Sequence, residues 1–304
     1  MTFIGTAAMG IGGWLRFSND IHRHSRKGHR WLATTYWPHA PFVSRFVANA
    51  AAILVKFEDG GRMRAILFDF GGTLDGPSHW LDRFLANYCA SGLSLSRDEL
   101  DSAYAYATRR AYDDSERLRE YGLARLVQYL VGAQFDWLLE KGPLEVRGVL
   151  GSSGARKSQM AEQISRGFVG ESARGLERGR KVLRTLKSRF SLGVVSNFYG
   201  NLDHVLAEAR IAELLGAVAD STRLGFFKPD VRIFKEALHQ LGVVPGDAVM
   251  VGDSLDKDCA PARSLGLKTI WVRDPGAQAR GDEAMADYRI STLDELEGFE
   301  WQAV

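Results

Sequence analysis

The sequence has little of what marks a secreted, membrane-spanning or nucleic-acid-binding protein. Only two of its 304 residues are cysteines, Cys89 and Cys259, and they lie far apart in the chain. Two distant cysteines do not make a disulfide framework, so a reducing cytoplasm is expected. No stretch reaches the roughly 18 uninterrupted apolar residues of a membrane span. The 39 basic and 37 acidic residues nearly cancel, which gives no indication of a nucleic-acid partner.

The amino-terminal stretch MTFIGTAAMGIGGWLRF is apolar, but it lacks the basic region that opens a secretory signal. Its first positive charge, Arg16, follows the apolar run instead of preceding it. We therefore expect no export and no integral membrane association.

Residues 1–62 differ in composition from the rest of the chain. They hold eight basic and three acidic residues, whereas the remainder holds 31 basic and 34 acidic residues. They show no sustained hydrophobic periodicity, and the first strand-like run begins just after Met63. Three alternatives stay open for this extension: a dispensable or disordered segment, which includes a miscalled start; a membrane-surface or partner-binding arm; or a structured addition to the fold.

Short apolar runs alternate with helical patterns from residue 64 onward. The runs predicted to be strands are RAILFDF (64–70), LGVVSN (192–197), GAVAD (216–220), AVMVGD (248–253) and TIWV (269–272). Continuous Val/Ile/Leu runs separated by amphipathic helices are typical of a parallel sheet covered on both faces. We therefore predict an α/β fold with a Rossmann-like, doubly wound parallel sheet, whose ligands bind at the carboxyl ends of the strands.

Residues 78–178 show helical patterns and no convincing strand. Ser96 and Glu99 form a capping-box pattern that opens a helix, and a helical stripe of apolar residues extends over 118–130. Turn signals follow at Gly142-Pro143 and at GSSG (151–154). We predict an inserted all-helical cap at 78–178, with an α/β core formed by 63–77 and 179–304.

Polar side chains stand where the predicted strands end. Asp69 follows the first strand and precedes a glycine-rich turn, in which backbone N–H groups can approach an anion. Ser196, Asn197, Asp253 and Asp258 lie at or just after the ends of later predicted strands. Lys228 lies just before a predicted helix. Three carboxylates at one sheet edge suit Mg²⁺, because a cation and a lysine would offset their mutual repulsion.

Four segments, in order, resemble the motifs of the haloacid dehalogenase superfamily. They are FDFGGTLD (68–75), VVSN (194–197), GFFKPDVRIF (225–234) and GDSLDKD (252–258). The resemblance spans about 63–296 and includes a helical cap of the first type between the first two motifs. It implies a Mg²⁺-dependent hydrolase, with a phosphomonoester phosphatase acting on a small phosphorylated metabolite as the leading interpretation.

The resemblance also implies roles for individual residues. Asp69 would be the nucleophile that forms an aspartyl-phosphate, and Lys228 would neutralise charge on it and on the phosphate. Thr73 and Ser196 would donate hydrogen bonds to the phosphoryl oxygens, with Asn197 beside them as a further substrate-binding residue. The implied ligands of Mg²⁺ are Asp69, the backbone carbonyl of Gly71, Asp253 and Asp258.

The sequence departs from the family pattern at Gly71. Phosphatases of this superfamily usually carry an aspartate there, which protonates the leaving group and then activates water. Glycine transfers no proton, and the loss of such a group typically costs about 10² to 10⁴ in rate. The first explanation is a phosphatase whose proton comes from Asp75, His79 or a cap residue, or whose leaving group needs none.

Two further explanations change the reaction or remove it. The scaffold could cleave another bond, as a dehalogenase or as a phosphonate-cleaving enzyme that uses Lys141 or Lys157 of the cap for a Schiff base. Alternatively, the protein could bind a phosphorylated metabolite without turnover. The sequence carries no signal for an oligomeric state.

Overall fold

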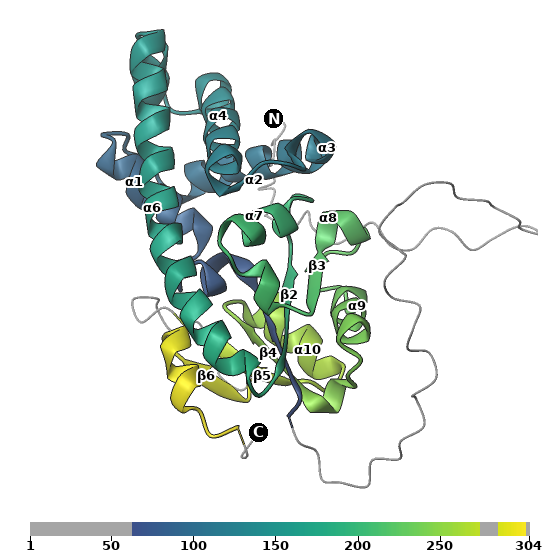
Figure 1. Cartoon of the computed structure of the whole chain (residues 1–304). Helices are drawn as coiled ribbons and strands as arrows, with labels where there is room; N and C mark the ends of the chain where they lie inside the picture. Colours follow the sequence, from purple (N-terminus) through teal and green to yellow (C-terminus); the bar gives the residue numbers. More distant parts are fainter. Residues whose placement is uncertain (1–62, 274–284, 302–304) are drawn as a thin grey trace, which may run out of the picture. The chain divides into compact units, whose positions relative to one another are not determined.

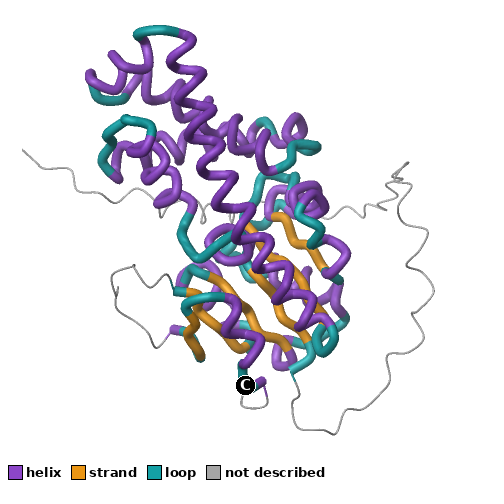
Figure 2. Tube along the Cα trace, turned by 60° about the vertical axis from the view of Figure 1, so that its left-hand side comes forward, coloured by secondary structure: helices purple, strands orange, loops and turns teal. Residues whose placement is uncertain are grey.

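The computed structural model describes residues 63–273 and 285–301, so the expectations for residues 1–62 lie outside the described part of the chain. Its centre is a six-stranded, fully parallel sheet with the order β3-β2-β1-β4-β5-β6 (Figures 1 and 2). The strands are β1 (Ala65–Phe68), β2 (Ser191–Ser196), β3 (Ala217–Asp220), β4 (Ala248–Gly252), β5 (Lys268–Val272) and β6 (Tyr288–Ile290). The predicted doubly wound sheet is confirmed.

Both faces of the sheet are buried, as the continuous apolar runs predicted. Ala65 and Leu67 of β1 point to one face and pack in a core with α9 (Arg232–Leu241) and α10 (Ala260–Ser264). Ile66 and Phe68 point to the other face, where the core includes α6 (Gly154–Lys187). Side chains alternate between faces along a strand, so a strand buried on both sides shows no polar alternation.

The strand order determines where a ligand can bind. The chain leaves β1 toward β2 and β3, then crosses back to the other side of β1 to form β4. The crevice between the carboxyl ends of β1 and β4 is therefore the topological switch point of the sheet. Asp69 follows β1 and Asp253 follows β4, so the sequence places two carboxylates at this crevice.

Residues 78–178 are all-helical, with no strand in this described segment. The helices are α1 (Trp80–Ala90), α2 (Arg97–Asp113), α3 (Ser115–Leu118), α4 (Leu123–Lys141), α5 (Leu144–Gly151) and the first part of α6. The capping box of Ser96 and Glu99 is present at the start of α2, since each side chain bonds the other residue's backbone N–H. Figure 1 shows these helices gathered above the sheet, with α6 descending from them along it.

The remaining helices and short turns lie between the strands, except for η6, which follows the last strand. They are η1 (Phe70–Leu74), α7 (Leu202–Glu208), η2 (Ala212–Leu214), α8 (Ser221–Leu224), η3 (Pro245–Asp247), η4 (Leu255–Cys259) and η6 (Leu293–Gly298).

Some boundaries differ from the sequence expectations. The apolar stripe over 118–130 belongs to two helices, because the chain leaves the helical conformation between Leu118 and Leu123. Strand β6 escaped prediction, since three residues are too few to show a period. Helix α6 continues without a break past residue 178, and the boundary between cap and core stays a prediction.

Candidate active site

The turn after β1 brings the backbone close to the crevice. Asp69 is followed by η1, in which Gly71 and Gly72 have non-helical backbone angles. Gly72 has φ +84°, and a Cβ there would lie 2.3 Å from Oδ2 of Asp253. Only glycine fits such a position, because it tolerates a positive φ and leaves room for the carboxylate. The glycine-rich turn thus allows Asp69 and Asp253 to share one crevice.

Asp69 is buried and held by two donors. The Ser196 hydroxyl donates to Oδ1 of Asp69 at 3.0 Å, and the Lys228 ammonium donates to the same oxygen at 2.7 Å. The ammonium also donates to Oδ1 of Asp258 at 2.6 Å, so one lysine bridges two carboxylates. Asp69 is 6% exposed, Lys228 5% and Asp258 0%. These groups come from four separate segments, which the sheet edge brings together.

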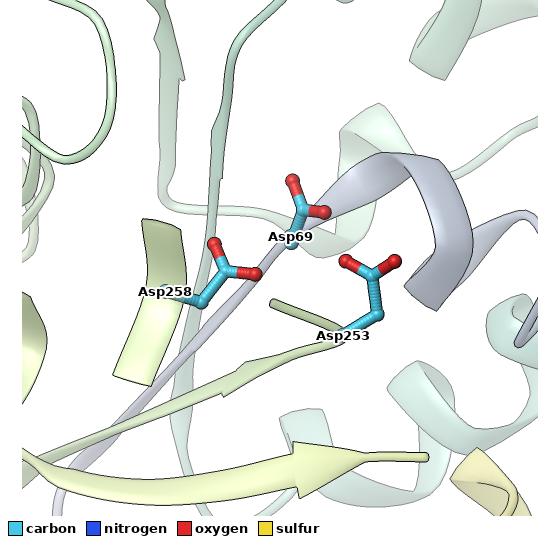
Figure 3. A group of neighbouring side chains, drawn as sticks. All are labelled: Asp69, Asp253 and Asp258. Atoms are coloured by element: carbon cyan, nitrogen blue, oxygen red, sulfur yellow. The ribbon is translucent and has the colours of Figure 1, made fainter. Parts of the chain in front are cut away.

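The three predicted acids form one group. Asp69, Asp253 and Asp258 each offer a carboxylate oxygen, and the three oxygens lie within 4.8 Å of one another. Figure 3 shows the three carboxylate groups lying next to one another. When ionised they carry three negative charges against one positive charge on Lys228. An all-oxygen donor set with two negative charges in excess fits a divalent cation such as Mg²⁺.

The charge imbalance shifts the pKa values of this site. Burial, and then the carboxylates of Asp69 and Asp258, raise the pKa of half-buried Asp253 well above its usual range. Burial raises the pKa of Asp258 to about 6, although the charge of Lys228 opposes the rise. Burial by itself would lower the pKa of Lys228, but Asp258 and Asp69 together outweigh it and raise the pKa. A bound dication would instead favour the ionised carboxylates.

The predicted substrate-binding residues differ in whether their side chains already hold hydrogen bonds within the protein. Ser196 lies at the cavity with its hydroxyl on Asp69. The Asn197 side chain accepts the backbone N–H of Lys228 at 2.7 Å and donates to the Lys228 carbonyl at 3.0 Å, so it anchors the loop that carries the lysine. The Thr73 hydroxyl is buried, has no hydrogen-bond partner among the described residues and lies off the cavity lining.

The space beside Gly71 is partly filled by an indole. The backbone of Gly71 (φ −79°, ψ 119°) is open to any residue. A Cβ there would lie 3.1 Å from Nε1 of Trp80, which is tighter than ordinary contact. The Trp80 N–H donates to Oδ2 of Asp75 at 2.7 Å, which holds the ring in this position.

Asp75, one of the predicted sources of the missing proton, is fully engaged elsewhere. Its carboxylate accepts from the Arg83 guanidinium at 2.6 Å, the Gly72 N–H at 2.9 Å, the Trp80 indole and the Ser172 hydroxyl. Asp75 is 1% exposed and does not line the cavity. Burial raises its pKa, although the charge of Arg83 opposes the rise. The residue joins the turn after β1 to α1 and α6.

His79, the other predicted source, lies at the cavity mouth as the N-cap of α1. Its Nδ1 accepts the Leu81 N–H at 3.2 Å, which places the proton of the neutral ring on Nε2. Part of the His79 side chain is exposed to solvent. The surrounding protein nevertheless desolvates the ring, and this desolvation, together with the positive charge of Lys257, lowers the pKa of His79. The imidazole is therefore neutral at neutral pH and is a poor proton donor.

A cavity of about 1140 Å³ lies over the three carboxylates, between the cap helices and the sheet edge. The lysines that line it within the described residues are Lys228 and Lys257. Lys141 and Lys157, the predicted Schiff-base candidates, do not line it, so the phosphonate-cleaving alternative lacks its lysine here.

Sequence reasoning missed the cap residues that line this cavity. Tyr104, Thr108 and Tyr112 share one face of α2 at spacings of four residues, a signal that was readable in the sequence. What could not be read is that this face turns toward the sheet edge and not into the cap core.

A doubly wound parallel sheet with a helical cap and an aspartate-lysine cluster at its switch point indicates a capped hydrolase with a Rossmann-like core. The chain belongs to the haloacid dehalogenase superfamily, because the family model described as "haloacid dehalogenase-like hydrolase" matches residues 63–266. The resemblance inferred from the four motifs is thus confirmed.

Several proteins of this family are similar to the chain. Haloacid dehalogenase-like hydrolase domain-containing protein 3 of Bos taurus is 31% identical over 192 residues, which cover 61% of this chain and 72% of that protein. Phosphoserine phosphatase of Thermus thermophilus is 40% identical over 91 residues, or 30% of this chain and 36% of that protein. Glyceraldehyde 3-phosphate phosphatase of Methanocaldococcus jannaschii is 35% identical over 79 residues, or 26% and 35%. The two phosphatase matches span about a third of each relative.

Solved structures show the same fold. A dehalogenase crystallised as an intermediate complex matches with a TM-score of 0.52 at 17% identity, over 78% of this chain and 96% of that one. Likeness at this identity concerns the fold alone. Within residues 63–273 and 285–301, no helix combines the length and the apolar character needed to cross a membrane.

Proposed function

We propose that this protein is a Mg²⁺-dependent phosphomonoester hydrolase that acts on a small phosphorylated metabolite through an aspartyl-phosphate on Asp69. The observation that carries the proposal is the buried Asp69 carboxylate, held by Lys228 and Ser196 and grouped with Asp253 and Asp258 at the switch point. The phosphatases among the similar proteins support the same reaction class.

In the first step, a carboxylate oxygen of Asp69 attacks phosphorus, and the bond from phosphorus to the ester oxygen breaks. The leaving group departs with that electron pair. Lys228 orients the carboxylate and offsets negative charge as the phosphoryl group arrives. Ser196 would turn its hydroxyl from Asp69 to a phosphoryl oxygen. Water then attacks phosphorus and loses a proton to the solvent, the bond from phosphorus to the Asp69 oxygen breaks, and phosphate leaves while Asp69 is again a carboxylate.

The acids Asp69, Asp253 and Asp258, with the backbone carbonyl of Gly71, would hold the metal. When bound, Mg²⁺ supplies positive charge that stabilises the transferring phosphoryl group. The reaction is assigned to the cytoplasm as part of the same proposal, since Cys89 and Cys259 are unpaired and suit a reducing compartment.

The test uses acetyl phosphate, whose acyl leaving group needs no proton. The purified chain should release phosphate in Mg²⁺ and lose this activity in excess chelator. Asp69→Asn should abolish release, whereas Asp101→Asn, a change at an exposed cavity carboxylate outside the metal-binding group, should leave it intact. Full turnover in chelator would contradict the Mg²⁺ requirement of the proposal.

One observation favours a second candidate, a phosphometabolite-binding protein without turnover. Gly71 offers no acid, the Trp80 indole crowds its place, and neither Asp75 nor His79 replaces it. Saturable binding of a phosphate ester in calorimetry, with no phosphate release from any acyl, aryl or alkyl phosphate, would identify the protein as this binder.

A further inference from the structure

Aromatic side chains form a continuous array along one wall of the cavity. The Trp80 ring lies 6.0 Å from that of Phe198, Phe198 lies 5.4 Å from Tyr199, and Tyr199 lies 5.2 Å from Tyr112. All four residues line the cavity, and so does Tyr104 on the same face of α2 as Tyr112. We call these five residues the aromatic wall.

The wall begins at the nucleophile. Trp80 is the residue that a Cβ on Gly71 would touch at 3.1 Å, and Gly71 is two positions from Asp69. From there the array runs outward to Tyr112, whose ring packs edge-on at 5.1 Å against Phe227. A phosphoryl group at Asp69 would therefore direct its leaving group along this wall.

Trp80, Phe198 and Tyr199 are each at most 5% exposed, so they offer little of their surface to a ligand. Tyr104 and Tyr112 are half-buried and offer more of their surface to a ligand. Pairs of aromatic rings at 4.5 to 7 Å prefer edge-to-face or offset arrangements and contribute beyond their buried area. A saturated ring or a polar chain would gain none of this extra interaction.

The chemistry at Gly71 favours the same class of leaving group. With no acid beside the ester oxygen, a leaving group that is stable as an anion departs more easily. A phenolate, with a pKa of about 10 for its acid, is such a group and carries an aromatic ring. Two independent features, one of binding and one of proton transfer, thus point to one kind of substrate.

We propose that the aromatic wall is the leaving-group subsite and that the substrate is an aromatic phosphomonoester. The proposal rests on the proposed function for the position of the phosphoryl group, but the wall itself can be tested without turnover. Phosphonates bind like phosphate esters but cannot be hydrolysed, so the pKa of the leaving group has no influence on their affinity.

The experiment measures dissociation constants of phenylphosphonate, cyclohexylphosphonate and methylphosphonate by calorimetry in Mg²⁺ with the full chain. Phenylphosphonate should bind about tenfold more tightly than cyclohexylphosphonate. Tyr112→Leu should remove most of this preference and leave methylphosphonate binding unchanged, whereas Tyr112→Phe, which keeps the ring, should retain it.

Tyr106→Leu is the matched control, because Tyr106 is exposed on the same helix and does not line the cavity. Tyr104→Leu provides a second test of the wall in case Tyr112→Leu does not fold. A phenyl-to-cyclohexyl preference below twofold, or one that survives both leucine variants, would overturn the subsite.

The two proposals fail separately. Release of phosphate from acetyl phosphate without a ring preference among the phosphonates would refute the aromatic subsite and leave the hydrolase intact. A ring preference without any phosphate release would support the aromatic wall as a binding site for the ring of a phosphorylated ligand and would refute the hydrolase.

Discussion

Two buried charge clusters flank the same glycine turn, and they differ in how their charge is balanced. The active-site cluster consists of Asp69, Lys228, Asp253 and Asp258, opens to the cavity and has negative charge in excess. The structural cluster pairs Asp75 with Arg83, with hydrogen bonds from Gly72, Trp80 and Ser172, and neither charged residue of this pair lines the cavity.

The comparison shows how two aspartates of one motif acquire different roles. A buried carboxylate that is paired with one cation and accepts enough hydrogen bonds has its charge and its hydrogen-bonding capacity satisfied. It then holds the elements around it in place. Carboxylates in excess over their cations stay unsatisfied until a further cation or a proton arrives. We therefore expect the two clusters to respond differently to metal and to loss of their basic residue.

The largest effect is expected on removing a carboxylate from the active-site cluster. Asp253→Asn should lower kcat/KM for acetyl phosphate by on the order of 10³ or more, because a metal ligand is lost. It should also abolish the rise in melting temperature that Mg²⁺ gives the wild-type chain through binding to the folded state. Wild-type turnover in this variant would mean that the acids do not hold the metal.

The second test removes the basic partner of each cluster. Arg83→Met and Lys228→Met should each cost about 3 to 5 kcal/mol in free energy of unfolding without metal, because buried carboxylates lose their partner. Arg110→Met is the control: its pair with Asp136 is exposed, so the cost should stay below about 1 kcal/mol.

Metal should then separate the two variants in thermal melts. Mg²⁺ should raise the melting temperature of Lys228→Met by more than that of the wild type, since the site loses its positive charge and keeps its three carboxylates. In Arg83→Met the rise should equal that of the wild type. Equal rises in both variants would contradict the charge difference between the clusters.

A smaller gain is expected from restoring the missing acid. Gly71→Asp alone crowds Trp80, so the variant to make is Gly71→Asp with Trp80→Phe, which removes the indole nitrogen that lies nearest. Its kcat on an alkyl phosphate should rise by on the order of 10² relative to Trp80→Phe, with a smaller rise on an aryl phosphate. Equal wild-type rates on both ester classes would mean that another residue donates the proton. Changes to Asn at each of the exposed acids that line the cavity, Asp82, Asp101 and Asp256, would then identify the donor.

The smallest effect is expected on changing Trp80, whose indole lies beside Gly71 and donates a hydrogen bond to Asp75. Trp80→Phe removes the hydrogen bond to Asp75 and should cost about 1 to 2 kcal/mol in chemical denaturation. Trp137→Phe, at a partly buried tryptophan of α4, is the matched control for loss of an indole. A cost no greater than that of the control would show that Arg83 alone satisfies Asp75.

Local patterns in the sequence were enough to predict most of the fold. Five of the six strands, the helical insert and the capping box at Ser96 follow from periodicity and from turn and capping residues. The positions of Asp69, Ser196 and Asp253 at strand ends followed in turn, since parallel strands bring their carboxyl ends to one edge. The chain by itself also showed that Gly71 carries no acid.

Only the tertiary structure decided what surrounds these residues. It revealed that Trp80 occupies the space beside Gly71, that Arg83 and Ser172 satisfy Asp75, and that Asn197 anchors the Lys228 loop. Each contact joins side chains from different elements, through angles and distances that no local period encodes. The sequence by itself determined which reactive groups exist and at which sheet edge they gather, whereas packing decided which of them remain free to react.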